Sequence, residues 1–455
     1  MKIIIIKILL LLFNSFNSKI LFVFEHFRHG ARNPCNHIDK NGKDFLGKKW
    51  DFVGELNNVG KKQHFLLGIR NREKYKNFLM DFYHPKEILA FSTNRNRTIE
   101  SLIANLMGMF YKKGKKMKEN QKKNSFPQKI NFSNNFNDDF NDFNLETFAI
   151  HLFKEEEHDF LLHEPKFCYP IKIIKYQLQN SMKKHAILFK NEFGSKLNEF
   201  FIKNGNEENS NKKDFFDSFI NVYDFCDHFI SDFIYDDEDL QIKKLTNYEI
   251  NLNNLFNHCQ KIAKIMQFDV VFGNDDVLFM SMSPSFKKII NWMEKRIFLH
   301  KINKTNELDY NSPKFVIFSG HDTTIAGFIK IMNKLFGSEI INPEFSANVF
   351  FELEFKDDKY FVNYLFGDEI LNRIEFYEFK KKIESFLWND KKIYKFCDFD
   401  YFNIYKILLF FLIIIIFVLA GILFYFIKKN KKLNNNNLKE IKPIKLKEEE
   451  NIKKE

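Results

Sequence analysis

A histidine stands between two arginines in residues 28–34, which read Arg-His-Gly-Ala-Arg-Asn-Pro. Guanidinium groups pair bidentately with phosphate oxygens, and histidine is one of the side chains that form covalent intermediates. The segment therefore predicts a binding site for a phosphate group, with His29 as the nucleophile at its centre. Because short motifs also arise by chance, a solvated basic loop is the alternative interpretation of this segment taken alone.

Two further groups of polar side chains follow short apolar runs, as residues 28–34 do. The three runs are residues 20–24, 88–91 and 315–318; all are predicted to be strands, and the first and third to be buried. The second run leads to Arg97, and the third leads to His321 and Asp322. Ligands bind beyond the carboxyl ends of the strands in open α/β sheets, so we expect the three loops to converge on one crevice.

Segments with helical spacing follow each predicted strand and would hold these loops in place. Asn57 is predicted to cap the first helix, and apolar residues recur at helical spacing in residues 99–110 and 325–336. Residues 349–355 and 360–366 predict a β-hairpin. The alternation of strand, loop and helix indicates an α/β layer fold.

Residues 28–34, together with His321-Asp322-Thr323-Thr324 far downstream, strongly resemble the histidine acid phosphatases, branch 2 of the histidine phosphatase superfamily. Further matches are Gly54-x-Leu56 to Gly60-x-x-Gln63, Ser92-Thr93 with Arg97-Thr98, and Phe351-Glu352-Leu353. The resemblance covers residues 20–110 and 315–366. It implies a three-layer αβα sandwich around a central, mostly parallel sheet.

The resemblance also implies a role for each polar residue. His29 is similar to the phosphorylated nucleophile, and Asp322 to the acid that protonates the leaving oxygen and then helps to activate water. The implied phosphate ligands are Arg28, Arg32, Arg97 and His321. An alkoxide is a poor leaving group, so a protonated carboxyl group that donates its proton to the leaving oxygen would speed the cleavage by general acid catalysis. No cofactor or metal is implied.

Smaller expectations accompany these roles. Gly30 is expected to allow a close loop, and Thr323 to cap the helix that follows it. Asn57 and Asn94 stand where the family usually has Thr and Asp, respectively. Asn57 can still cap a helix, whereas the substitution at Asn94 has no further explanation.

The two ends of the chain predict an exported protein with a membrane anchor. Residues 1–18 have a charged start, a short apolar run and small polar residues, which predicts a secretory signal peptide. Residues 407–427 contain no charge and are long enough to cross a bilayer. Residues 428–455 begin with several lysines. This polar segment is predicted to be a disordered cytoplasmic tail. The expected result is a single-pass type I membrane protein of a lysosome-like compartment or the cell surface.

The body between these ends is divided by a change in composition. Residues 19–111 and 303–400 are expected to form the α/β core. Residues 112–302 are expected to be an insertion, with a low-complexity loop at 112–147 and a mostly helical cap after it.

The formal net charge of +11 does not indicate nucleic-acid binding. Residues 428–455 contain ten Lys and five Glu and supply +5, and Lys2 and Lys7 supply +2. The remaining +4 is spread over the body of the chain, which is ordinary for a protein of this size.

Five cysteines are present, so at least one is unpaired or pairs with another chain. The family resemblance implies a disulfide between Cys168 and Cys397, and it leaves the other three unassigned. Asn131 and Asn303 stand in N-glycosylation sequons.

The sequence as a whole predicts an acid phosphatase that cleaves phosphomonoesters through a phosphohistidine. An inositol-polyphosphate (phytase-like) or lysophospholipid phosphatase of the same family is the alternative enzyme. A non-catalytic membrane receptor for phosphorylated ligands is the alternative from another class. The natural substrate and the oligomeric state are left open, a homodimer being one option.

Overall fold

The computed structural model describes residues 18–35, 46, 49–50, 52–110, 147–152, 168–203, 215–235, 241–398, 406 and 408–429. The predicted signal peptide (except Ser18), most of the predicted low-complexity loop, Asn131 and nearly all of the predicted tail lie outside these residues. The chain divides into two units, residues 1–166 with 171–393 and residues 167–170 with 394–455. The first unit contains the sheet and every predicted catalytic and phosphate-binding residue.

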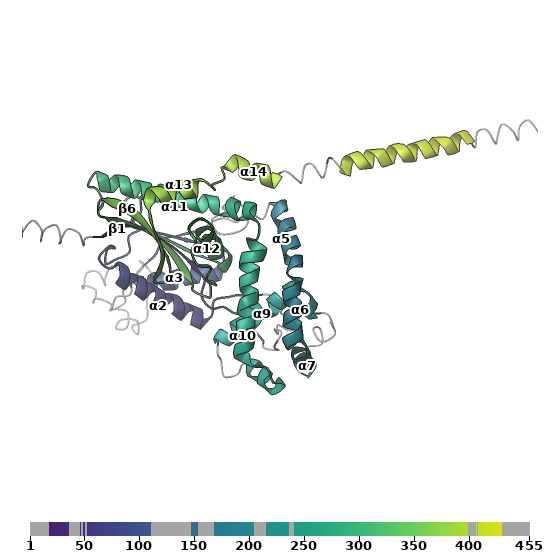
Figure 1. The fold of residues 1–455 in the computed structure, drawn as a ribbon, viewed down its shortest axis with the longest axis horizontal. Coiled ribbons are helices and arrows are strands. Elements are labelled where there is room, and N and C mark those ends of the chain that lie inside the picture. The colour runs from purple at the N-terminus through teal and green to yellow at the C-terminus, as the bar shows by residue number, and fades with distance from the viewer. Residues whose placement is uncertain are drawn as a thin grey trace, which may run out of the picture. The chain divides into compact units, whose positions relative to one another are not determined.

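A sheet forms the centre of the first unit (Figure 1). It has seven strands in the order β3-β2-β4-β1-β5-β6-β7. The strands are β1 Lys19–Arg28, β2 Ile88–Ser92, β3 Ile150–Leu152, β4 Phe315–Gly320, β5 Asn348–Lys356, β6 Lys359–Phe366 and β7 Glu369–Glu375. The first four pair in parallel, and β5, β6 and β7 continue as antiparallel neighbours. Strand β6 therefore points the same way as the parallel group, which confirms the predicted mostly parallel sheet and the predicted hairpin.

Helices cover both faces of the sheet because the strands bury side chains on both sides. In β1, Phe22 and Phe24 belong to one apolar core, and Val23 and Phe27 belong to another. The first core includes side chains of α11 Asp275–Lys301, α12 Asp322–Phe336 and α13 Phe376–Glu384, and the second those of α2 Asn58–Tyr75 and α3 Asn96–Met109. Figure 1 shows α2 on one side of the sheet and α11 with α13 on the other. The predicted three-layer αβα sandwich is confirmed.

A helical region with its own Phe-rich core lies between β3 and α11 in the sequence. Its α-helices are α5 Tyr169–Ser181, α6 Lys183–Phe189, α7 Ser195–Lys203, α9 Phe219–Tyr235 and α10 Leu252–Ile265. A disulfide between Cys226 and Cys259 joins α9 to α10. Strand β3 and helix α11 fall inside the expected insertion, residues 112–302, but they belong to the sheet and to the layer that covers it.

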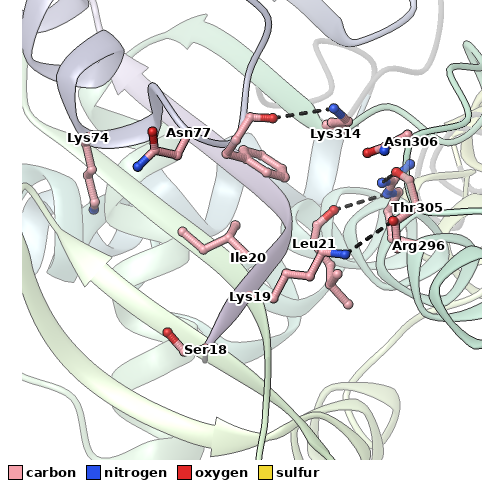
Figure 2. A pocket seen from close by; sticks show the side chains of 11 residues that line it. Ser18, Lys19, Ile20, Leu21, Lys74, Asn77, Arg296, Thr305, Asn306 and Lys314 are labelled. Atoms are coloured by element: carbon pink, nitrogen blue, oxygen red, sulfur yellow. Dashed lines mark hydrogen bonds between the residues drawn. The ribbon is translucent and has the colours of Figure 1, made fainter. Parts of the chain in front are cut away.

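At the start of β1, four cationic side chains line a cavity of about 360 Å³: Lys19, Lys74, Arg296 and Lys314 (Figure 2). The buried Arg296 donates from Nε to the carbonyl of Leu21 at 3.1 Å, and Lys314 pairs with Glu87 at 2.8 Å. These contacts hold α11 and the residue before β4, Lys314, against the sheet. The cavity lies at the opposite end of β1 from His29, about 30 Å along the strand.

The second unit contains the disulfide predicted between Cys168 and Cys397, which is confirmed. The latter cysteine lies in α14 Asp390–Asp398. A helix spans Leu408–Lys429 and is long and apolar enough to cross a membrane. Its bounds agree closely with the predicted span, residues 407–427.

Candidate active site

The three predicted loops meet because their strands are neighbours in the parallel part of the sheet. Arg28 is the last residue of β1 and is in register with Gly320, the last residue of β4. The backbone N–H of His29 donates to the Gly320 carbonyl at 2.9 Å, and that of Thr93, after β2, donates to the Ser319 carbonyl at 3.3 Å. The predicted convergence at the carboxyl ends of the strands is therefore confirmed.

The imidazole of His29 is held in one tautomer. Its Nδ1 lies 2.9 Å from the carbonyl oxygen of Gly30, which can only accept, so in the neutral ring Nδ1 carries the hydrogen and Nε2 carries the lone pair. Burial, with the positive charges of Arg97, Arg28 and Arg32, lowers the pKa of His29 well below its usual value. The ring is consequently neutral and has an available Nε2, the form that a nitrogen nucleophile requires.

Arg28 and Arg32 are fixed through their terminal nitrogens. Arg28 donates from Nη1 to the Pro343 carbonyl at 3.0 Å and pairs through Nη2 with Asp322 at 2.9 Å. Arg32 donates from Nη1 to the Asn33 carbonyl at 3.1 Å and from Nη2 to both oxygens of Asp227, at 2.8 and 3.0 Å. Both guanidinium groups are thus oriented before any ligand binds.

The inner nitrogens of three arginines have no such contacts. Among the residues that the structure describes, the buried Nε atoms of Arg28, Arg32 and Arg97 have no hydrogen-bond partner. Arg97 lies in the first turn of α3, and burial lowers the pKa of its guanidinium. A buried donor without a partner is costly, and an anion with several acceptor oxygens is the kind of ligand that satisfies guanidinium donors.

His321 and Thr93 join the second and third loops. Nε2 of the buried His321 lies 3.2 Å from Oγ1 of Thr93, and that hydroxyl lies 2.7 Å from Oγ1 of Thr98. This chain of contacts gives a structural reason for the Ser92-Thr93 and Arg97-Thr98 matches. It places His321 with its ring centre 5.6 Å from that of His29.

Asp322 is the first residue of α12, where the helix dipole favours a negative charge. Its Oδ2 accepts from Nη2 of Arg28 at 2.9 Å and from Nε2 of Gln267 at 3.1 Å. Its Oδ1 accepts from the backbone N–H of Thr323 at 2.8 Å. The expectation that Thr323 caps this helix is wrong: His321 occupies the N-cap position, and Asp322 satisfies the Thr323 N–H instead.

The motif loop lies directly against the start of α2. A Cβ on Gly30 would be 2.5 Å from the backbone oxygen of Gly60, so the predicted need for glycine at this position is confirmed. Gln63 accepts from the backbone N–H of Ala31 at 2.9 Å. Asn57 accepts from the backbone N–H of Gly60 at 3.0 Å, which confirms the predicted cap.

Comparison with known proteins decides the family. The profile of the histidine phosphatase superfamily (branch 2) matches residues 19–367, most of the chain. The chain belongs to this superfamily. The predicted resemblance is therefore confirmed.

Individual relatives of this histidine phosphatase match over short stretches. This chain is 38% identical to lysosomal acid phosphatase of Rattus norvegicus over 90 residues, which make up 20% of this chain and 21% of that protein. It is 33% identical to prostatic acid phosphatase of Homo sapiens over 99 residues, 21% of this chain and 25% of that protein. The chain thus aligns with about a fifth to a quarter of the length of these curated relatives.

Solved structures share the fold of this histidine phosphatase at low sequence identity. The phytase of Citrobacter braakii has a TM-score of 0.55 and 14% identity, covering 81% of this chain and 98% of the phytase. The Hafnia alvei phytase in complex with myo-inositol hexakis sulphate has the same TM-score and identity, covering 82% and 98%. The likeness establishes the fold alone.

The helical region contributes residues to this histidine phosphatase site that the sequence did not reveal. Asp227 of α9 pairs with Arg32, and Gln267 contacts Asp322. Burial raises the pKa of Asp227, but the charges of Arg32, His228 and Arg28 and the hydrogen bond from Arg32 together outweigh burial, so the pKa lies below its usual value. No motif surrounds these residues, so only a three-dimensional contact could find them. Within the described residues, no cluster of His, Cys, Asp or Glu is arranged to hold a metal ion.

Proposed function

We propose that this protein hydrolyses phosphomonoesters through a phosphohistidine formed at His29. One observation carries the proposal: the three arginines whose charges act on the neutral imidazole of His29 each have a buried Nε donor without a hydrogen-bond partner among the described residues. Such an arrangement suits a phosphoryl group, because positioning and charge stabilisation supply most of the catalysis in phosphoryl transfer. Membership of the histidine phosphatase superfamily supports the same reaction.

The reaction proceeds in two balanced steps. Nε2 of His29 attacks phosphorus, the bond from phosphorus to the ester oxygen breaks, and Asp322 gives its proton to the departing alcohol. Water then attacks the phosphohistidine, Asp322 takes a proton from that water, and inorganic phosphate leaves with His29 restored. Arg28, Arg32 and Arg97 hold the phosphoryl oxygens throughout, with His321 as a further donor.

The proposed place of this reaction is the lumenal or extracellular side of a membrane. The apolar helix Leu408–Lys429 would anchor the chain, with the lysines after it on the cytoplasmic side. Two disulfides support an exported body. Asn303 is an exposed residue of the turn after α11, consistent with its proposed glycosylation. A lysosome-like compartment fits the lysosomal acid phosphatase relatives.

The experiment uses the full chain in detergent micelles, with p-nitrophenyl phosphate as substrate and a chelator present, at several pH values from 4 to 7. We expect hydrolysis that is fastest under acidic conditions, since Asp322 must carry a proton in the first step. Rapid acid-free quenching with labelled substrate should trap a phosphoryl group that is acid-labile and base-stable, as phosphohistidine is. His29→Ala should remove both signals. An active His29→Ala variant would contradict the proposal.

A further inference from the structure

The cavity at the start of β1 brings together cationic side chains from four parts of the fold. Lys19 belongs to β1, Lys74 to α2 and Arg296 to α11, and Lys314 directly precedes β4. Figure 2 shows Lys74 and Arg296 on opposite sides of Leu21. The volume of about 360 Å³ lies within the range of small-molecule sites in proteins. No Asp or Glu among the described residues lines this cavity.

Two of the four cations have a carboxylate partner outside the lining. Lys314 pairs with Glu87 at 2.8 Å, and Lys74 pairs with Glu352 at 2.9 Å. Both carboxylates are buried, and neither of them lines the cavity. The charge of the cavity is therefore decided by the other two cations.

Arg296 is a buried cation whose charge is not paired. Its residue is only 1% exposed, and its hydrogen-bond partners in the described part of the chain are the backbone carbonyls of Leu21, Thr305, Glu307 and Ser312. The carboxylate of Glu307 pairs with Lys304 instead, at 3.1 Å. Burial lowers the pKa of Arg296, and the charge of Glu87 opposes this effect. Carbonyls satisfy the N–H groups but do not neutralise the guanidinium, so a nearby anion would offset the cost of burying it.

Lys19 supplies the second unpaired charge. Its Nζ donates to Oγ1 of Thr305 at 3.3 Å, and it makes no ion pair with a described residue. An ammonium has three N–H donors, so donors are left for a ligand. Four cations with two carboxylate partners leave two positive charges at the cavity, which matches the charge of a dianion.

The uncharged part of the lining suits the organic part of such an anion. Ile20, Leu21 and Phe78 supply apolar surface, and Asn77 and Asn306 supply amide groups. A lone phosphate would fill only part of about 360 Å³, whereas a phosphate with a small organic group would also contact the apolar wall.

We propose that this cavity is a second ligand site, which binds a small organic phosphate as a dianion through Lys19 and Arg296. The cavity lies at the opposite end of β1 from His29, so both sites can be filled in one chain. The ligand would contact β1, α2 and α11 together and would stabilise the folded chain by binding to it. Its binding does not depend on the proposed phosphatase reaction.

Phenylphosphonate is the probe, because its carbon–phosphorus bond is not a phosphate ester and it carries two negative charges at pH 8. Calorimetric titration of the full chain in non-ionic micelles should show a binding event that weakens at least about tenfold in Lys19→Glu, which removes both unpaired positive charges from the balance. The monomethyl ester of phenylphosphonate, with one negative charge, should also bind at least about tenfold more weakly at this site.

Lys359→Glu is the matched control. Lys359 is exposed at the start of β6, at the same end of the sheet as Lys19, and it does not line the cavity. This variant should bind phenylphosphonate as the native chain does. Equal weakening in both variants, or none in Lys19→Glu, would overturn the proposal, and so would equal binding of the monomethyl ester.

A second measurement locates the ligand in the native chain. Phenylphosphonate should slow the acetylation of Lys19 by acetic anhydride and leave that of Lys359 unchanged, as measured by mass spectrometry of peptides. Unchanged acetylation of Lys19 at saturating probe would contradict a site in this cavity.

The two proposals fail in different ways. Lys19→Glu should still hydrolyse p-nitrophenyl phosphate at the native rate, because Lys19 is remote from His29. A native chain that binds phenylphosphonate at Lys19 but does not hydrolyse p-nitrophenyl phosphate would contradict only the phosphatase proposal.

Discussion

Nη2 of Arg28 lies 2.9 Å from Oδ2 of Asp322, which joins the last residue of β1 to the first residue of α12. A proposed phosphate ligand and the proposed proton donor therefore touch each other. In the proposed reaction, this contact keeps the carboxyl group next to a side chain that binds the phosphoryl group. It also means that removal of either side chain disturbs the other, so effects of their substitutions will not be additive.

Asp322→Asn tests the proton donor. The amide keeps the shape and can still accept from Arg28, but it cannot supply a proton to the alcohol. We expect kcat/KM to fall about a hundredfold or more for alkyl phosphates and by less than about tenfold for p-nitrophenyl phosphate, whose leaving group needs little protonation. The ratio of the two losses is the measurement. Equal losses for both substrates would exclude the acid role.

Gly30→Ala tests the close approach of the motif loop to α2. The added Cβ would lie 2.5 Å from the Gly60 oxygen, so the loop must move and carry His29 with it. A displacement of about 1 Å costs about a hundredfold in rate, and we expect at least that loss of kcat. Gly337→Asn is the control, since Asn tolerates the left-handed conformation of that exposed helix end and nothing lies within 4 Å of its Cβ. Full activity of the alanine variant would contradict this account.

His26 makes stability depend on pH. It is buried and stacks on Phe318, and burial lowers its pKa from 6.5 to about 3. Between those values the unfolded chain binds a proton that the folded chain does not, so its contribution to stability falls as pH drops below about 6.5. From pH 6.5 to 5 the loss amounts to about 2 kcal/mol.

His26→Phe removes this titration and keeps an aromatic ring in the core. The measurement is the free energy of unfolding in denaturant at pH 6.5 and pH 5, with disulfides intact. The variant should lose about 2 kcal/mol less than the native chain between these two pH values, whatever its absolute stability. The same pH dependence in both proteins would show that His26 does not titrate as described.

The disulfide between Cys226 and Cys259 stabilises the wall that carries Asp227. It closes a segment with a sequence separation of 33, for which chain entropy predicts a contribution of about 3–4 kcal/mol. Replacement of both cysteines by serine should lower the melting temperature and raise KM, because Asp227 follows Cys226 directly. An unchanged melting temperature would argue against the disulfide between Cys226 and Cys259.

The native chain should expose one reactive thiol, at Cys35.

Much of the fold was predictable because burial leaves a local pattern. Strands β1, β2 and β4 are short apolar runs, and α12 carries an apolar face, so their type and order follow from the sequence. Strand β3 was not predicted, since its three residues, Ile150–Leu152, offer no pattern long enough to recognise. The boundary of the insertion was also out of reach, because α11 resembles the helices before it until its contacts with the sheet are known.

The sequence by itself determined the candidate side chains for the chemistry, since only a few residue types can hold a phosphate, and parallel strands bring their carboxyl ends to one edge. Tertiary structure decided the rest: the tautomer of His29, the pairing of Arg32 with Asp227, and the contact of Gln267 with Asp322. The physical reason lies in the Phe-rich core of the helical region. Apolar packing of that kind specifies burial but not the direction in which a helix presents its few polar side chains, so those contacts appear only once the chain has folded.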